Sequence, residues 1–239
     1  MRVLAVVPCW NALDRLPSVL GALEGQVEAT FVFDNHSADG SAEWLRDRQP
    51  AELLRLAGTN LGFPAAVNAG LGEARRRGAD AVLLVNDDAV FQAGAVEALA
   101  GRMLAEPSAG AVSARMLYRD RPGILNGAGG QWWPRRARAV LRGAGEPDRG
   151  QYDDLPEVDY PSGAASLLNM AAVDRIGGMD ERFYLYFEDA DWGLRARAAG
   201  WRTLYAPGAV ALHVGSAGTA ARPARRRYYN VRNRLLLAS

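Results

Sequence analysis

The 239-residue sequence predicts a single α/β domain built on a mostly parallel, twisted sheet with helices on its faces. Over roughly the first hundred residues, short apolar runs alternate with helical patterns, which is typical of βαβ units. The hydrophobic fraction of 49% is ordinary for a globular chain, and a domain of this length buries a full core without a disulfide or metal staple. No repeat, low-complexity block or linker divides the chain, so we expect one domain over residues 1–239.

The first part of the chain alternates expected strands with expected helices. The strands are short apolar runs at 3–7, 29–33, 52–56 and 81–85. The helices lie at 13–23, 41–48, 64–78 and 95–106, and the first of them has apolar residues at helical spacing. The helix over 64–78 ends in arginines followed by Gly78, a pattern that favours helix termination.

The second part is less regular. From 118 to 161 the chain is rich in Gly, Pro, Arg and Trp, with weak periodicity. A loop this long in a compact domain usually covers or binds something, although its tryptophans could equally well only pack on the domain. Ordered structure is expected again at 163–169 and 172–176, in a helix over 189–199, in strands at 203–205 and 210–213, and in a basic amphipathic helix over 223–237.

Charge and cysteine content narrow the class of protein. The net charge of +1 argues against nucleic-acid binding, and every basic residue is Arg. The single cysteine, Cys9, follows an apolar run, so we expect a buried thiol in a reducing compartment. That run stops at Pro8 and lacks a signal-peptide cleavage site, and no apolar stretch is long enough to span a membrane. These features predict a cytoplasmic protein, and the Arg- and Tyr-rich segment 222–234 suits an anionic membrane surface or a lipid-diphosphate acceptor.

Polar clusters follow three of the expected strands. Ligands bind at the carboxyl ends of the strands in a parallel sheet, where these clusters meet. A single cluster is as often a simple turn, but three at one sheet edge predict a binding site. The clusters are residues 8–11, Asp34-Asn35 and Asn86-Asp87-Asp88.

Asn86-Asp87-Asp88 is the sharpest of these clusters. Two adjacent carboxylates repel each other unless a cation neutralises them, although a solvated turn is the simpler alternative. Hard oxygen ligands suit Mg²⁺ or Mn²⁺ shared with a substrate diphosphate. Neither a GxGxxG nor a GxxxxGK[ST] phosphate loop is present, and the glycines at 127–130 lack the flanking strand and helix of a dinucleotide site.

A second group of chemically active residues lies near the end of the chain. Glu188, Asp189 and Asp191 follow an aromatic run and begin an expected helix, where carboxylates also stabilise the helix dipole. Aromatic surroundings can raise a carboxylate pKa toward the working pH, as a general base requires. His213 ends a short strand, and its imidazole is either a structural group or one that completes a metal site.

Several segments, in order, resemble those of one known family. They are VVPCWN at 6–11, FDNHSADGS at 33–41, NLGFPAAVNAG at 60–70, LLVNDDAV at 83–90, SGAASLL at 162–168, GGMDERFYLYFEDADWGLRARAAGW at 177–201, HVGSAG at 213–218 and YYNVRNRLLL at 228–237. Each segment alone is weak, but the ordered set is specific and spans almost the whole chain. The chain resembles glycosyltransferase family 2, with the GT-A fold, and within it the bacterial rhamnosyltransferase-like branch.

The resemblance implies a nucleotide-binding half over 1–117, an acceptor and catalytic half with a smaller mixed sheet over 118–222, and a tail helix over 223–239. It implies that a nucleotide-sugar site involves Pro8, Asn11, Asp34, Asn35, Asn60, Gly62, Asn68 and Asp87. Asn86-Asp87-Asp88 stands where the family has its DxD metal motif, with Asn in the first position, so Asp88 is the main expected ligand. Asn86 and His213 complete the expected site for Mn²⁺ or Mg²⁺.

For catalysis, Asp189 matches the family's general base. Asp191 is the second candidate because, two residues further along a helix, it points elsewhere, and Glu188 is the third. One in-line displacement would invert the anomeric centre. We expect the acceptor to contact Trp132 and Trp133, whose faces suit sugar rings, together with Ser162 and Gly163.

These features predict transfer of a sugar, rhamnose or a related hexose, from a dTDP- or UDP-linked donor to a glycan or lipid-linked acceptor. We expect a cytoplasmic enzyme, at the inner face of the membrane if the tail binds lipid. Two alternatives remain. A non-catalytic sugar-nucleotide-binding module is favoured only by Asn86, where an acidic residue is usual. A sugar-phosphate nucleotidyltransferase would need a phosphate loop after the first strand, and this segment has none.

Overall fold

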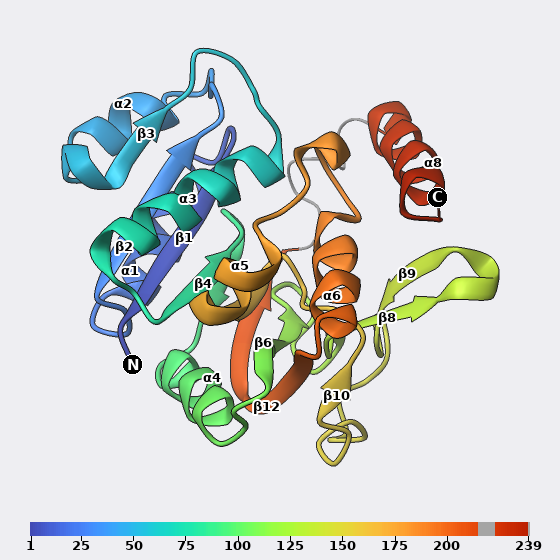
Figure 1. Cartoon of the computed structure of the whole chain (residues 1–239). Helices are drawn as coiled ribbons and strands as arrows, with labels where there is room; N and C mark the ends of the chain where they lie inside the picture. Colours follow the sequence, from blue (N-terminus) through green and yellow to red (C-terminus); the bar gives the residue numbers. More distant parts are fainter. Residues whose placement is uncertain (215–222, 239) are drawn as a thin grey trace.

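The computed structural model describes residues 1–214 and 223–238. Its centre is one large twisted sheet with the strand order β10-β12-β6-β11-β4-β1-β2-β3 (Figure 1). Strands β1 to β4 pair in parallel, and β6 and β12 form a second parallel pair. Between these two groups lies β11, which runs antiparallel to both β4 and β6. The strand bounds in the first half are β1 Val3–Cys9, β2 Ala29–Asp34, β3 Leu54–Leu56, β4 Ala81–Val85, β5 Ala89–Phe91 and β6 Ala109–Tyr118.

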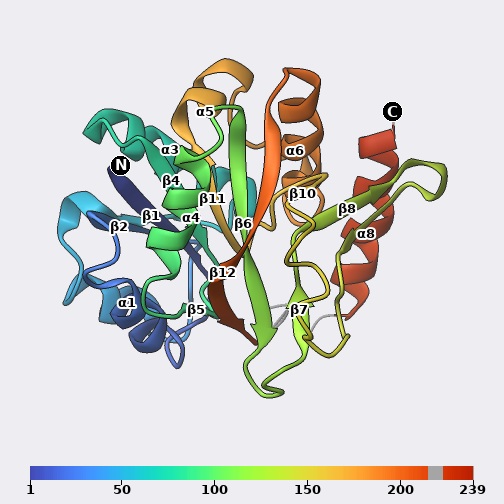
Figure 2. The same cartoon turned by 90° about the horizontal axis from the view of Figure 1, so that it is seen from below.

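Helices cover both faces of this sheet. Figure 2 shows α1 and α4 on one side and α3, α5 and α6 on the other. Because side chains alternate along a strand, β1 serves both layers. Its Ala5 packs with the α1 and α4 layer, and its Val6 packs with the α3 layer. The helix bounds are α1 Leu16–Leu23, α2 Ser41–Arg46, α3 Phe63–Arg77, α4 Ala95–Leu104, α5 Met170–Ile176, α6 Glu188–Ala198 and α8 Pro223–Ala238, with 3₁₀ turns at Ala51–Leu53, Pro134–Arg136 and Glu181–Phe183.

The close approach of α3 to the sheet depends on a glycine. A Cβ added at Gly70 would lie 2.4 Å from both methyl groups of Val6. The helix begins after Gly62 with proline in its first turn, where the missing N–H costs nothing. It ends at Gly78 in a left-handed conformation with φ 66°, as the sequence predicts.

The segment 118–161 is more ordered than the irregular loop that was expected, while its expected role as a cover or binding segment stays a prediction. It contains β7 Leu125–Gly127, β8 Gly130–Trp133, β9 Arg138–Leu141 and β10 Glu157–Val158. Strands β8 and β9 pair antiparallel as a separate two-stranded sheet, which lies beside α8 in both views (Figures 1 and 2). The segment therefore contains short strands where the sequence predicted a long loop.

The strands near the carboxyl end of the chain also differ from those predicted. Two short strands were expected, but β12 runs continuously over Arg202–His213 and follows β11 Ala165–Asn169 in the chain. Its register against β6 shifts between Ala206 and Val210. Pro207 and Gly208 lie in that interval, and a residue without an N–H tends to sit at such irregularities. Strands β5 and β6 were not predicted at all.

The predicted α/β class, with a sheet flanked by helices and a smaller second sheet, is confirmed. Cys9 is buried as expected, and burial raises the pKa of its thiol. In the part of the chain that the structure describes, no helix is both long and apolar enough to cross a bilayer. Arg222 and residues 215–218 of the HVGSAG segment lie outside the described residues.

Candidate active site

A cavity of about 430 Å³ opens where the two halves of the sheet meet. Its floor is formed by the carboxyl ends of β1 and β4, and its walls come from the loop before α6, from β9 and from α8. The expected site residues among its lining are Pro8, Asn35, Asn60, Gly62, Asn86, Asp87, Asp88, Ser162, Gly163, Glu188, Asp189 and His213. Residues from distant parts of the chain thus share one concave space, as ligand sites in this class of sheet require.

Asp88 and His213 meet at the floor of the cavity. Pairing of β12 with β5 sets His213 opposite Ala89, which is next to Asp88 in the chain. His213 Nε2 then lies 2.9 Å from Asp88 Oδ1, and both side chains are buried. On its other side, His213 Nδ1 lies 3.0 Å from Asn126 Oδ1. With the imidazole proton on Nδ1, that atom donates to Asn126 Oδ1, and Nε2 faces the carboxylate oxygen of Asp88.

This donor set fits a divalent cation. A neutral Nε2 and a carboxylate oxygen both offer lone pairs to the space between them, and a shared cation removes the conflict. Within residues 1–214 and 223–238, no group of three or more His, Cys, Asp or Glu side chains could hold a metal, so any further ligands must be of other kinds. Asn86 lines the same cavity.

Asp87 points to the first strand instead. Its Oδ2 accepts the Trp10 backbone N–H at 3.0 Å, and its Oδ1 lies 4.0 Å from the Arg15 guanidinium. Burial raises the pKa of Asp87 to about 7, and repulsion by Asp88 adds to the shift. Asp87 therefore ties the end of β4 to the turn after β1 while it lines the cavity.

The expected nucleotide residues divide into two groups. Asn35 lines the cavity, and its amide accepts the Leu61 N–H at 3.0 Å and donates to the Gly62 carbonyl at 3.2 Å. Asn11 and Asp34 are not among the lining residues, and both shape the turn that follows β2. Asn11 Oδ1 accepts the Ala38 N–H, while Asp34 Oδ2 accepts the Ser37 N–H.

One carboxylate oxygen of Asp34 has no donor in the structure. Asp34 is 1% exposed, and its Oδ1 has no hydrogen-bond partner among the described residues. A buried carboxylate oxygen left without a donor is costly. We therefore expect a donor, from solvent or a ligand, at this position.

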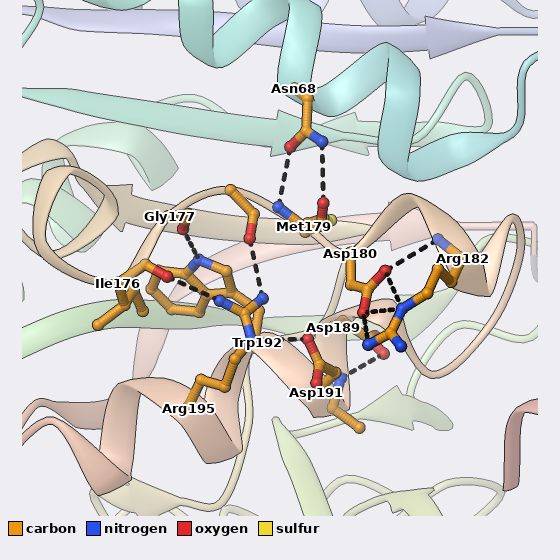
Figure 3. Close-up of polar contacts among 12 residues, drawn as sticks. Asn68, Ile176, Gly177, Met179, Asp180, Arg182, Asp189, Asp191, Trp192 and Arg195 are labelled. Carbon is orange, nitrogen blue, oxygen red and sulfur yellow. Dashed lines mark hydrogen bonds and ion pairs between the residues drawn. The ribbon is translucent and has the colours of Figure 1, made fainter. Parts of the chain in front are cut away.

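Asn68 does not line the cavity at all. Figure 3 shows its amide facing the turn before the Glu181–Phe183 3₁₀ segment. Its Nδ2 donates to the Met179 carbonyl at 2.8 Å and its Oδ1 accepts the Met179 N–H at 2.8 Å. Nδ2 also lies 3.0 Å from Glu181 Oε1. Asn68 therefore links α3 to the loop that leads into α6. Its side chain faces this loop and not the cavity.

Asp189 lies in the cavity at the start of α6. Its Oδ2 accepts the Gly163 N–H at 3.1 Å and its Oδ1 accepts the Ala190 N–H at 2.8 Å. Burial raises the pKa of Asp189. The next residue after Gly163, Ala164, accepts the Asn86 N–H through its carbonyl at 3.0 Å. Two consecutive residues therefore join Asp189 to the Asn86-Asp87-Asp88 cluster.

The two other carboxylates of this segment differ from Asp189. Glu188 is buried in the cavity wall, and burial together with the Asp189 charge raises its pKa well above the usual range. Asp191 does not line the cavity and forms an ion pair with Arg195 at 2.8 Å. Arg195 in turn donates to the Ile176 and Gly178 carbonyls (Figure 3). Asp191 therefore contacts the loop before α6 through Arg195, and it is not among the residues that line the cavity.

The acceptor side is only partly as expected. Ser162 and Gly163 line the cavity, but Trp132 and Trp133 of β8 do not. Trp133 is 40% exposed and lies within 6 Å of the guanidinium groups of Arg136 and Arg138. The wall on this side is formed instead by Ala139–Leu141 of β9 and by Tyr160, whose hydroxyl donates to the Val140 carbonyl. The tryptophan contacts with the acceptor are therefore not supported by the position of β8.

The residues near the site that were not anticipated include Asn126 beside His213, Tyr160 in the wall and Asn233 on α8. Arg225, which belongs to the basic segment noted in the sequence, also lines the cavity. The YYNVRNRLLL segment was noted, but no local signal shows that its polar residues turn toward a loop some 50 residues earlier.

A family model described as "Glycosyltransferase like family 2" matches residues 1–233. The chain belongs to this family. The predicted resemblance is thereby confirmed, and the protein is a glycosyltransferase.

Individual relatives agree. The glycosyltransferase is 29% identical to the N-acetylglucosaminyl-diphospho-decaprenol L-rhamnosyltransferase of Mycobacterium tuberculosis (strain H37Rv), over 89% of this chain and 75% of the relative. Its fold is similar to that of GalNAc-T7 with UDP, GalNAc and Mn²⁺ (TM-score 0.70, 12% identity), which it covers over 44% of that chain and 89% of its own. It is also similar to the mannosyltransferase PcManGT of Pyrobaculum calidifontis with GDP-Man and Mn²⁺ (TM-score 0.63, 20% identity), over 62% of that chain and 96% of its own. These similarities show a GT-A fold.

Proposed function

We propose that this glycosyltransferase is an inverting enzyme. It moves rhamnose or a related hexose from a dTDP- or UDP-linked donor to a hydroxyl group of a glycan or lipid-linked acceptor. The observation that carries the proposal is that Asp189 and the Asp88–His213 pair line one cavity, joined through Gly163 and Ala164. The name of the mycobacterial relative supports a rhamnosyl donor and an acceptor with a prenyl diphosphate.

Asp189 is the proposed general base. Two backbone N–H groups hold its oxygens in place, and each oxygen retains lone pairs for an acceptor hydroxyl. Burial raises the pKa of this carboxyl, so the ionised form is a stronger base than an exposed aspartate. As the hydroxyl oxygen attacks the anomeric carbon, its proton passes to Asp189, which is typically worth 10²–10⁴-fold in rate. A single displacement from the opposite face inverts the anomeric centre.

Asp88 and His213 are the proposed protein ligands of a divalent cation, with Asn86 as a third candidate. Mn²⁺ accompanies the nucleotide in two of the structural neighbours, and Mg²⁺ suits the same oxygen ligands. Such an ion offsets charge on the leaving diphosphate. Asn126 orients the His213 ring so that Nε2 faces Asp88. Asp87 accepts a hydrogen bond from the backbone after β1 and so holds the carboxyl end of β4 next to the proposed nucleoside side of the cavity.

A thermal-shift screen tests the donor and metal assignments. UDP, dTDP, GDP and their sugars are added with and without Mn²⁺, and a ligand at a hundred times its Kd should stabilise the protein by about 2.7 kcal/mol. We expect selective stabilisation by one nucleotide, greater with Mn²⁺ than without it. The Mn²⁺-dependent part should vanish in Asp88→Ala and in His213→Ala. A metal-dependent shift that survives both substitutions would refute the proposed ligands.

The outer face of α8 suggests a peripheral contact with an anionic lipid surface. Tyr228, Val231 and Leu235 are 59%, 58% and 69% exposed and follow one another at helical spacing. Arg227 and Arg232 line the same face, and the helix contains no acidic residue. The opposite face of α8 lines the cavity. Apolar and basic groups together match a bilayer with anionic headgroups, and this contact would bring the cavity close to a lipid-borne acceptor.

Vesicle sedimentation tests this contact. The protein should bind vesicles of phosphatidylglycerol and phosphatidylcholine more tightly than vesicles of phosphatidylcholine alone, and less tightly in high salt. Leu235→Glu should reduce binding. Leu104→Glu, at a residue 65% exposed at the end of α4, is the matched control and should not. Equal loss in both variants, or binding without charge dependence, would contradict the assignment.

A further inference from the structure

The loop that leads into α6 is strained. Tyr184, Tyr186 and Phe187 have φ values of 62°, 70° and 73°, a left-handed region that aromatic residues rarely adopt. Each such residue costs about 1–3 kcal/mol and persists only where its surroundings hold it. Glu188 and Asp189 follow directly, so the position of the Asp189 carboxylate depends on this conformation.

One side chain lies within hydrogen-bond distance of three carbonyl groups of the loop. Asn233 of α8 is fully buried, and its Nδ2 lies 2.9 Å from the Phe183 oxygen and 2.7 Å from those of Leu185 and Tyr186. The remaining carbonyl, that of Tyr184, accepts the Phe63 N–H at 2.8 Å. Nδ2 carries two hydrogens, so it donates to two of these three oxygens at a time, and the Phe183 carbonyl also accepts the Leu185 N–H at 2.7 Å.

Other contacts fix α8 to the same loop. The Tyr229 ring stacks on Tyr184 with centroids 5.0 Å apart and planes 16° from parallel. The Arg225 guanidinium donates to the Tyr184 hydroxyl at 2.5 Å. These contacts hold α8 against the loop, so the Asn233 amide has a defined place among the carbonyls.

The earlier part of the loop does not depend on α8. Asn68 binds Met179, and Arg195 binds the carbonyls of Ile176 and Gly178. Loss of Asn233 would therefore free only the strained segment 183–187, next to the cavity, and would leave the turn at 176–181 in place.

We propose that Asn233 is a positioning residue for sugar transfer, because its amide holds the strained loop in the one conformation that keeps Asp189 in the cavity. This inference rests on the proposed role of Asp189 as the base. Asn233 does not line the cavity. Its substitution should consequently impair the chemical step and spare nucleotide binding.

The first test compares Asn233→Ala with Val96→Ala. Val96 is buried on α4, on the opposite face of the sheet, and its truncation lowers stability without reaching the loop. With dTDP-rhamnose, Mn²⁺ and an N-acetylglucosaminyl-diphospho-prenol, kcat of Asn233→Ala should fall about 100-fold, the cost of a misplacement of about 1 Å. The Kd for dTDP with Mn²⁺ should stay unchanged. Hydrogen exchange of amides 184–190 should accelerate in Asn233→Ala alone.

A double-mutant cycle separates this proposal from the assignment of the base. If Asn233 acts through Asp189, Asn233→Ala should add no further loss in an Asp189→Asn background. Full activity of Asp189→Asn would refute the assignment of Asp189 as the base. A loss of activity in Asn233→Ala would then have a cause other than the position of Asp189. Equal, additive losses in both backgrounds would overturn the positioning role.

Further outcomes also decide the matter. An unchanged kcat in Asn233→Ala, or a loss of dTDP affinity as large as the loss of kcat, would overturn the proposal. If Asn233→Ala does not fold, Asn233→Ser keeps one donor and should show an intermediate kcat. If neither variant folds, Asn233 supports the whole domain and not the loop alone, which would also overturn it.

Discussion

Asn68→Ala is expected to destabilise the glycosyltransferase without weakening nucleotide binding. The asparagine amide exchanges two hydrogen bonds of 2.8 Å with the backbone of Met179, a residue only 3% exposed. Each such bond contributes about 1 kcal/mol, and a buried group left unpaired costs about 1–3 kcal/mol. The contact with Glu181 is exposed and adds little. We therefore expect the free energy of unfolding to fall by about 2–4 kcal/mol, which lowers the Tm by about 4–16 °C for a domain of this size.

The assay pairs thermal unfolding with titration of UDP or dTDP in Mn²⁺. Asn35→Ala is the matched control, because its amide also bridges two backbone groups but lines the cavity. Asn35→Ala should lose both stability and nucleotide affinity, whereas Asn68→Ala should lose only stability. Weakened nucleotide binding in Asn68→Ala at an unchanged Tm would refute the architectural interpretation and restore the expectation drawn from the sequence.

Three further substitutions probe the cavity wall. Burial and the Asp189 charge raise the pKa of Glu188 well above its usual range, which favours the neutral acid that glutamine mimics. Glu188→Gln should therefore retain transfer activity to within about tenfold, unlike loss of a base, and a larger loss would shift the role of base to Glu188. Burial raises the pKa of Asp189, so the folded protein binds that proton more tightly than the unfolded chain and loses stability as pH rises above about 4. The Tm of Asp189→Asn minus that of the native protein should then grow from pH 4 to pH 8, and a constant difference would contradict this. Gly193→Ala would place a Cβ 2.4 Å from Tyr160 Cβ. We expect the free energy of unfolding to fall by about 1–3 kcal/mol and the KM to rise. An unaltered Tm would show that Tyr160 can move without cost and would contradict this prediction.

Local patterns in the sequence predict most of the regular elements. The expected strand at 81–85 matches β4, and the expected helices at 64–78 and 189–199 match α3 and α6 to within a residue at each end. Apolar runs and helix-ending glycines are local signals, which explains this agreement. The predicted convergence of strand ends is likewise a consequence of parallel topology, and it brings Asn35 and Asp88 into one cavity.

The remainder depends on contacts between distant residues. Asn68 binds a residue 111 positions away, and Asn233 binds carbonyls 47 to 50 positions away. An amide has no preferred partner in the sequence, so only the folded topology reveals whether it faces a ligand or a backbone. The β8–β9 hairpin was missed for a similar reason, since its turn through Pro134–Arg136 ends at Ala137 with φ 42° and carries no glycine.

The most direct test of the central claim is single-turnover transfer by Asp189→Asn, measured alongside its affinity for dTDP and Mn²⁺. The amide keeps the size of the side chain and can still accept the Gly163 N–H, but it cannot take the acceptor's proton. We predict a transfer rate at least about 100-fold lower with an unchanged Kd for the metal–nucleotide pair. A variant that transfers sugar at the native rate would contradict the account, because Asp189 would then lie beside the reacting sugar without taking part in the reaction.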